Sequence, residues 1–315
     1  MLELPDSWVW DFWFARDGDR YHLFFLYASR ALHDPGRRHG RASIGHAVSD
    51  DLRSWTRVAD ALVHGDRPAF DDAATWTGSV VQGPDGTWHM FYTGASERDG
   101  VLIQSIGVAR SRDLFTWEKY EGNPIVAADP RWYEKYDGSA WFDEAWRDPW
   151  VFEDPGGDGW HMLITGRANH GPVDDRGVVG HARSRDLLHW EVQPPLSEPG
   201  AGFGHLEVFQ VEVVEGQIVL LFNCLRNELS AAKKTTSGSG GVWSLTADSA
   251  TGHFDISKAT PLTDDSLYVG RLVRDVDGAW VMLAFHNEGP DGFIGAISDP
   301  MPVYLTPDGL ALKPA

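Results

Sequence analysis

Five apolar runs of five residues each recur along the chain about 55–75 residues apart. They are rich in aromatic and branched residues, which favour strands, and none has the length or period of an amphipathic helix. A turn rich in glycine, aspartate or glutamate precedes each run, and another apolar stretch precedes the turn, so each run predicts the second strand of a hairpin. The runs cover residues 21–25, 88–92, 160–164, 218–222 and 280–284.

A motif of eleven residues, G-x-A-x-S-x-D-L-x-x-W, follows three of these hairpins. It covers residues 45–55, 107–117 and 180–190, and weaker copies begin near Gly241 and Gly295. Strand, turn, strand, loop, strand and corner, repeated five times, is typical of propeller blades. The sequence therefore predicts an all-β chain whose 315 residues form a single five-bladed β-propeller domain.

Three of the predicted first strands carry an acid inside an apolar run: Asp11, Asp148 and Glu207. Such a carboxylate must be hydrogen-bonded, paired or exposed at an edge, because burying it bare is costly. The second strand begins ten to twelve residues after each acid, which predicts equivalent positions in the three blades. Since the first strands of blades line the central channel, we expect these acids to surround one funnel.

Clustered carboxylates can divide the roles of acid and nucleophile, because nearby like charges raise the pKa of one of them. Glycoside hydrolysis uses such a pair, about 5–5.5 Å apart in retaining enzymes and about 6.5–9.5 Å apart in inverting ones. The fifteen tryptophans fit a sugar ligand, since the indole face suits the C–H face of a sugar ring. At least half of them are expected to be core residues only.

The formal net charge of −19 argues against nucleic acid and anionic membranes as partners, because both attract basic surfaces. No apolar stretch reaches the length of a membrane span, and no secretory signal is visible, so a cytoplasmic protein is expected. The single cysteine, Cys224, excludes an internal disulfide and a cysteine-cluster metal site. Without a D-x-D-x-D loop, we expect neither a metal nor a cofactor. The oligomeric state is not predicted.

Four segments of the chain share motifs with known enzymes. They are V-W-D-x-W at residues 9–13, T-G-S-V at 77–80, Y-E-G-N-P-I at 120–125 and R-D-P at 147–149. The first resembles the first-blade motif of glycoside hydrolase family 68, the levansucrases. The other three are similar to segments shared by family 68 and family 32, the invertases and fructanases. The resemblance covers about residues 5–225 and implies a five-bladed propeller, here without the C-terminal β-sandwich of family 32.

The resemblance also implies a retaining glycoside hydrolase that acts on a β-fructofuranoside or similar furanoside, with water preferred over a sugar as acceptor. Asp11 would be the nucleophile, Glu207 the general acid/base, and Asp148 the residue that binds sugar hydroxyls and steadies the transition state. Glu207 is followed by Val208-Phe209 instead of the family strings E-C-P-D or E-R-A, so sucrose is not assigned as the substrate. The residues expected to bind the sugar are Trp10, Trp76, Ser79, Arg147, His205 and Gln210.

Two other functions stay open on the residues alone. A related inverting five-bladed family acts on arabinan or xylan, with its carboxylates further apart. A propeller that binds sugar without catalysis is the second alternative, and it would not need all three acids. Two local predictions complete the picture. The corner acids Asp51, Asp113 and Asp186 should bond nearby backbone N–H groups, and residues 231–241 should form a polar, flexible loop.

Overall fold

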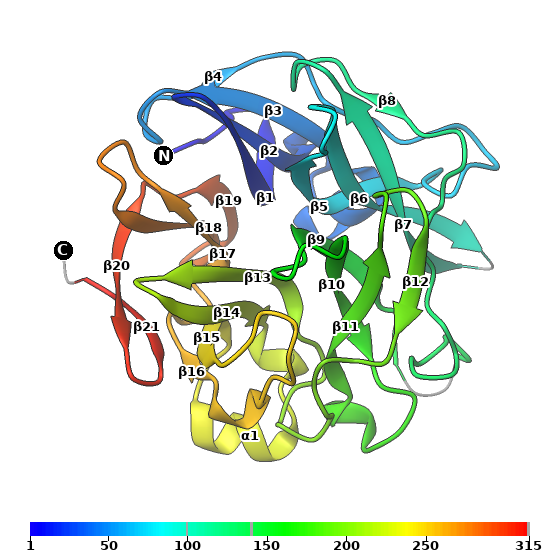
Figure 1. Ribbon diagram of the computed structural model, residues 1–315, viewed down its shortest axis with the longest axis vertical. Coiled ribbons are helices and arrows are strands. Elements are labelled where there is room, and N and C mark those ends of the chain that lie inside the picture. The colour runs from blue at the N-terminus through cyan, green and yellow to red at the C-terminus, as the bar shows by residue number, and fades with distance from the viewer. Residues whose placement is uncertain (99, 139–140, 314–315) are drawn as a thin grey trace.

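The computed structural model describes residues 1–98, 100–138 and 141–313. Its strands form five antiparallel sheets, which follow one another round a ring in chain order, as Figure 1 shows. The innermost strand of each sheet contacts the innermost strands of the two neighbouring sheets. This arrangement confirms the five-bladed propeller predicted from the sequence repeat.

Four consecutive strands build each of the first four blades. The first blade comprises β1 (Ser7–Asp17), β2 (Arg20–Ser29), β3 (Ser43–Ser49) and β4 (Thr56–Arg57). The second comprises β5 (Ala74–Gln82), β6 (Trp88–Arg98), β7 (Val101–Ser111) and β8 (Glu118–Lys119). The third comprises β9 (Trp146–Glu153), β10 (Trp160–Arg167), β11 (Gly177–Ser184) and β12 (Trp190–Gln193). The fourth comprises β13 (Glu207–Val214), β14 (Gln217–Cys224), β15 (Gly241–Ala247) and β16 (Thr260–Pro261).

The fifth blade differs from the others because its third strand is split. It comprises β17 (Leu267–Arg274), β18 (Trp280–Gly289), β19 (Gly292–Ile297), β20 (Met301–Thr306) and β21 (Gly309–Leu312). Both β19 and β20 pair with β18, the former with its C-terminal half and the latter with its N-terminal half. Pro300 stands between them, and proline lacks the N–H that would continue the ladder.

The repeated corner is built from local hydrogen bonds. In the first copy, Asp51 accepts the backbone N–H groups of Arg53 at 2.8 Å and Ser54 at 2.7 Å. The leucine that follows the aspartate takes a left-handed φ of 62–68° in all three copies and buries its side chain. In the second copy the tryptophan indole N–H of Trp117 donates to the carbonyl of Leu114 at 3.0 Å. Asp113 and Asp186 repeat the aspartate contacts, so the predicted structural role of these acids is confirmed.

Residues 231–241 do not form the loop that the sequence predicts, because they include the helix α1 (Ala231–Ser237). The Ser230 hydroxyl accepts the N–H of Lys233 at 3.2 Å, and Gly238 follows the helix with a φ of 79°. Serine before a helix and glycine after it are ordinary capping residues. Short 3₁₀ turns occupy other loops: η1 (Arg30–Leu32), η2 (Pro35–Arg41), η3 (Val173–Asp175), η4 (Arg226–Glu228) and η5 (Ile256–Lys258).

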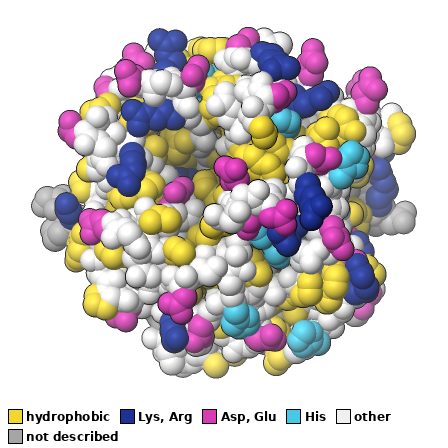
Figure 2. Space-filling model, in the orientation of Figure 1, with side chains coloured by type: hydrophobic (Ala, Val, Ile, Leu, Met, Phe, Trp, Pro, Cys, Tyr) yellow, Lys and Arg dark blue, Asp and Glu magenta, His cyan; other side chains and the backbone are white. Residues whose placement is uncertain are grey.

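The two ends of the ring are joined by the N-terminal segment. Leu2 and Ile297 exchange two backbone hydrogen bonds of 2.9 Å, which attach the start of the chain to β19 in the last blade. Apolar side chains fill the space between the blades, as where Phe24 of the first blade meets Trp117 of the second edge to face. On the face drawn in Figure 2, basic side chains lie among the acidic ones. None of the helices in the described part of the chain is both long and apolar enough to cross a bilayer.

Candidate active site

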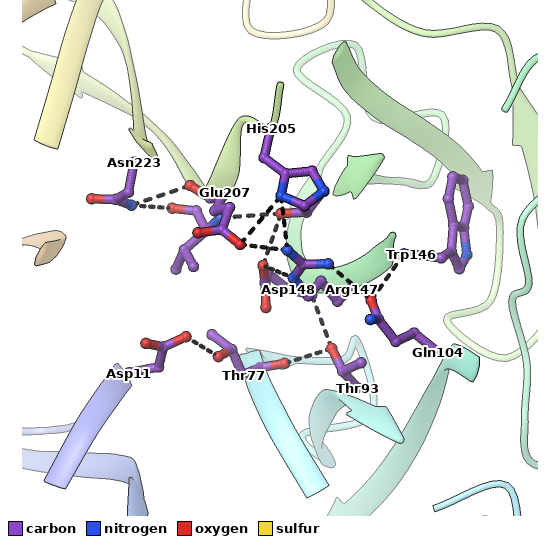
Figure 3. A network of polar contacts seen from close by, with 12 residues as sticks. Asp11, Thr77, Thr93, Gln104, Trp146, Arg147, Asp148, His205, Glu207 and Asn223 are labelled. Atoms are coloured by element: carbon purple, nitrogen blue, oxygen red, sulfur yellow. Dashed lines mark hydrogen bonds and ion pairs between the residues drawn. The ribbon is translucent and has the colours of Figure 1, made fainter. Parts of the chain in front are cut away.

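One pocket of about 440 Å³ is lined by residues from all five innermost strands. It contains the three acids singled out from the sequence, Asp11, Asp148 and Glu207, and Figure 3 shows the first of them facing the other two across an open space. The contributions of the innermost strands are Trp10 and Asp11 from β1, Trp76 and Thr77 from β5, Arg147 and Asp148 from β9, Glu207 from β13 and Tyr268 from β17.

A bulge in each innermost strand turns these side chains toward the pocket. The ladder between β1 and β2 passes from Val9 to Phe12 with an irregularity, and the other four innermost strands shift register at a corresponding point. In three of them a non-glycine residue at the bulge has a left-handed φ: 59° at Asp148, 54° at Val208 and 52° at Val269. Such bulges bend a strand and redirect its side chains.

The three acids do not occupy equivalent positions, contrary to the prediction from their spacing. Glu207 belongs to the last ladder pair before its bulge, Asp148 lies one residue beyond such a pair, and Asp11 lies two residues beyond. In a regular strand each one-residue step would turn the side chain to the opposite face of the sheet. The bulge suspends this alternation, so the acids reach the same pocket from three successive positions.

Asp11 is held by a neighbour that sequence reasoning missed. The Thr77 hydroxyl donates to Oδ2 of Asp11. Burial raises the pKa of Asp11 to about 6; the Thr77 hydrogen bond opposes this rise and the charge of Glu207 adds to it. Arg271 and Arg38 also favour the ionised carboxylate. At neutral pH this acid is therefore mostly ionised.

Asp148 is anchored through both its backbone and its side chain. Its N–H donates to Thr93 Oγ1 at 2.9 Å, and its Oδ2 accepts the Thr165 hydroxyl at 2.8 Å. Burial raises its pKa to about 7, while Arg147, whose Nε lies 3.6 Å from Oδ2, opposes the rise. The charges of Asp11 and Glu207 raise this pKa further. Near neutral pH, Asp148 can thus both donate and accept hydrogen bonds.

Glu207 has a donor on each carboxylate oxygen. Arg147 Nη2 donates to Oε1, and the Tyr268 hydroxyl donates to Oε2 at 2.5 Å. Arg147 also contacts Asp143 at 3.0 Å and Gln104 at 3.0 Å. Figure 3 shows Arg147 between Glu207 and Gln104, so it links Glu207 to another residue that lines the pocket.

His205 lies behind the pocket and does not line it. Its side chain is fully buried, and the indole N–H of Trp141 donates to its Nε2 at 2.9 Å. An indole nitrogen is only a donor, so Nε2 accepts, and the neutral ring carries its proton on Nδ1. Burial lowers the pKa of His205 to about 3. Nδ1 lies 3.3 Å from Arg147 Nη2, but with its proton on Nδ1 the ring cannot accept a hydrogen bond from this guanidinium. His205 therefore packs behind Arg147 and does not reach into the pocket.

Ser79 and Gln210 are also outside the pocket, although the sequence suggested sugar contacts for both. Ser79 Oγ accepts the N–H of Val151 at 3.1 Å and so connects β5 to β9. The Gln210 amide bonds both backbone groups of Leu272, at 2.9 Å and 2.8 Å, and so connects β13 to β17. Both side chains lie beyond their bulges, where they join the innermost strands of adjacent blades.

Further residues line the pocket that the sequence did not single out. Arg38 and His39 come from η2, and the Arg38 guanidinium lies 5.5 Å from the centre of the Trp10 ring. Phe142 stands at the rim with 63 % of its surface exposed. Glu228, which is partly buried, has a pKa raised to about 7, chiefly by desolvation. These residues lie in loops, whose path over the pocket follows from tertiary structure and leaves no periodic signal.

One group of described residues has the spacing of a metal site. The possible ligand atoms of His205, Glu207 and Glu228 lie within 4.8 Å of one another. Arg147 donates to Glu207 in the same place, and a guanidinium opposes the binding of a cation. We therefore assign no metal to these residues.

Curated proteins similar to this chain include β-fructofuranosidases. β-Fructofuranosidase 1 of Zea mays is 29% identical over 206 residues, which cover 63% of this chain and 28% of that protein. Acid β-fructofuranosidase AIV-18 of Capsicum annuum is 34% identical over 113 residues, which cover 35% of this chain and 16% of that protein. The chain thus spans less than a third of the length of these curated relatives.

Solved structures share the fold over nearly the whole chain. An inulosucrase from Halalkalicoccus jeotgali bound to kestose aligns with a TM-score of 0.79 and 22% identity, covering 99% of this chain and 90% of that one. The Bombyx mori GH32 β-fructofuranosidase BmSUC1 aligns with a TM-score of 0.75 and 21% identity, covering 100% of this chain and 64% of that one.

A family match covers most of the chain. Residues 13–288 match the family described as the glycosyl hydrolases family 32 N-terminal domain. This match begins within β1 and ends one residue before the end of β18, so it includes the second to fourth blades, most of the first and the two inner strands of the fifth. The chain therefore belongs to the glycosyl hydrolase family 32 N-terminal domain family.

Proposed function

We propose that this chain is a retaining glycoside hydrolase that cleaves β-fructofuranosides or a similar furanoside by double displacement. The observation that carries the proposal is the convergence of Asp11, Asp148 and Glu207 on one pocket. Curated relatives named β-fructofuranosidase and fructan 1-exohydrolase support the choice of substrate class.

Asp11 is proposed as the nucleophile. Its pKa of about 6 leaves it mostly ionised at neutral pH. Thr77 holds Oδ2, which fixes the carboxylate and leaves Oδ1 for attack on the anomeric carbon. The product of this first step would be a covalent fructosyl-enzyme ester, which water then hydrolyses.

Glu207 is proposed as the general acid/base. In the first step it would protonate the oxygen of the leaving group, and in the second it would take a proton from the attacking water. Tyr268 and Arg147, which bond its two oxygens, hold the carboxyl group in a fixed orientation for both transfers.

Asp148 is proposed to bind the sugar. With a pKa raised to about 7, its carboxyl group can accept and donate hydrogen bonds to ring hydroxyls, and its anionic form stabilises the positive charge that develops on the ring. Trp10 and Trp76 line the same pocket and offer apolar faces to the sugar.

Amide substitutions test the proposal. The unsubstituted chain and the variants Asp11→Asn and Glu207→Gln should each be incubated with sucrose, short fructans and an aryl β-fructofuranoside. The fructose that is released should then be measured. Each amide variant should lose at least about 10³-fold in kcat, because the proposed nucleophile or acid/base is gone. Asp113→Asn is the matched control, since this aspartate lies in a corner turn and should leave turnover unchanged.

Three results would count against the proposal. Turnover like that of the unsubstituted chain in either amide variant would remove the acids from the chemistry. Proton NMR of the first product should show the β-anomer, and an inverted anomer would refute the double displacement in favour of the single displacement of the related inverting family. Sugar binding without any product would indicate a non-catalytic propeller.

A further inference from the structure

One buried guanidinium lies beneath the three acids. Arg271 belongs to β17 and is 1 % exposed. Its Nε donates to the carbonyl of Phe12 on β1 at 3.1 Å, and its Nη1 donates to the carbonyl of Phe209 on β13 at 2.5 Å. Its guanidinium also lies 5.1 Å from the centre of a Trp150 ring on β9. A single side chain therefore joins the four innermost strands β1, β9, β13 and β17.

Each of these contacts is close to an acid in the sequence. The first carbonyl belongs to the residue directly after Asp11, and the second belongs to the second residue after Glu207. The tryptophan is the second residue after Asp148. Arg271 does not line the pocket of the acids but borders a hollow at the other end of the channel. It thus touches every strand that carries an acid from the side away from the pocket of the acids.

The charge of Arg271 is not used in a direct ion pair. No carboxylate among the described residues lies within 4.0 Å of it, and its Nη2 has no hydrogen-bond partner there. The charged groups that face it are Asp11, Asp148 and Glu212, and Arg274 lies near Glu212. Burial lowers the pKa of Arg271 to about 10, and these carboxylates oppose the fall, so the guanidinium stays charged at neutral pH.

A buried positive charge without a carboxylate in contact with it is costly, and binding two carbonyl groups would not by itself require a charged side chain. We propose that Arg271 is a positioning residue for the catalytic acids: its hydrogen bonds hold the strands behind the bulges, and its charge favours the anionic form of Asp11. This inference rests on the proposed function and adds a residue that does not touch the sugar.

The charge and the hydrogen bonds can be separated by two substitutions. Arg271→Lys keeps the charge, whereas Arg271→Gln keeps an N–H donor but removes the charge. Arg274→Gln is the matched control, because Arg274 is an exposed residue of the same strand, with its guanidinium 4.4 Å from the centre of the Trp280 ring. The measurement is kcat and KM for fructose release as a function of pH.

The sign of the expected effect follows from the groups around Asp11. Glu207 and burial favour its neutral form, whereas Thr77, Arg271 and Arg38 favour its anion. Around Asp148, Arg147 favours the anion, while Asp11 and Glu207 oppose it. Removing the charge of Arg271 therefore raises the pKa of Asp11. In Arg271→Gln the acidic limb of kcat/KM should move about one pH unit to higher pH.

Arg271→Lys and Arg274→Gln should keep the acidic limb of the unsubstituted chain, and KM should change less than kcat in Arg271→Gln. An unmoved limb in Arg271→Gln would overturn the inference. Failure of both Arg271 variants to fold, checked by circular dichroism, would also overturn it by assigning Arg271 to folding alone. If the unsubstituted chain releases no fructose, the proposed function itself fails, and this inference fails with it.

Discussion

Thr77 donates a hydrogen bond that favours the ionised form of Asp11, the proposed nucleophile, so Thr77→Val is a direct test of how the site sets the charge of Asp11. Valine keeps the branched shape at a position that is 1 % exposed and removes only the hydroxyl. Burial and the charge of Glu207 continue to raise the pKa of Asp11 in the variant, while the opposing hydrogen bond is lost.

The size of the effect can be estimated. A hydrogen bond to a charged group contributes about 1.5–3 kcal/mol, and one pKa unit corresponds to about 1.4 kcal/mol. The acidic limb of kcat/KM should therefore move about 1 to 2 pH units to higher pH. From a starting pKa of about 6, the ionised fraction of Asp11 at pH 7 would fall from about 90% to about 10–50%. At pH 7 the rate should drop about 2- to 9-fold, and the difference should narrow at higher pH.

The assay is kcat/KM for an aryl β-fructofuranoside between about pH 4 and about pH 9. Thr87→Val is a matched control: Thr87 is also buried and donates to an aspartate, Asp85 at 2.7 Å, but in a turn outside the pocket. It should keep the original profile. An acidic limb in Thr77→Val that coincides with that of the unsubstituted chain would refute the reasoning, and an equal loss at every pH would indicate misplacement of Asp11 instead of a change in its ionisation.

Three further predictions concern stability and binding. Burial raises the pKa of Asp11 and Asp148 in the folded state, so the folded chain binds more protons than the unfolded one. The free energy of unfolding should therefore fall as pH rises from about 4 to about 7. At pH 8, Asp11→Asn should be more stable than the unsubstituted chain by on the order of 3 kcal/mol in denaturant titrations, and a less stable variant would contradict this. Phe142→Ala should raise KM about 3- to 10-fold by removing an exposed ring at the rim, whereas Phe115→Ala, also exposed but outside the pocket, should not; equal effects of the two would refute a sugar contact. Ser79→Ala should cost about 1 kcal/mol of stability and leave KM unchanged, and a raised KM would return Ser79 to the sugar site.

The blades could be predicted from the sequence because the repeated corner is held by contacts between its own residues. Asp51 bonds backbone groups two and three residues away, and Trp117 reaches the carbonyl of Leu114. Such short-range chemistry leaves a fixed spacing. The split strand of the fifth blade depends on Pro300 and on pairing with β18, and α1 depends on the capping residue Ser230. Each of these features rests on one residue in a polar segment, and such a residue cannot be distinguished in the sequence from other loop residues.

The acids of the site could be recognised in the sequence because a carboxylate in an apolar run is costly to bury unless it is paired or hydrogen-bonded. Their exact offsets were not, since these depend on bulges that appear only when a strand is paired with its neighbour. The same cause explains why Thr77 lies in the pocket while Ser79, two residues later, joins two blades. Arg38 and Phe142 reach the pocket through loops whose course is set by the whole ring.

The bulges have a consequence for how related propellers are compared. Aligned by ladder pairs, Asp148 falls opposite Val208 of the next blade and Asp11 opposite Phe209, so columns that hold a reactive group in one blade hold an apolar residue in another. During evolution a carboxylate could thus shift by one position along an innermost strand and still face the pocket. Homologous chemistry in such rings is better recognised from where side chains converge than from which column they fill.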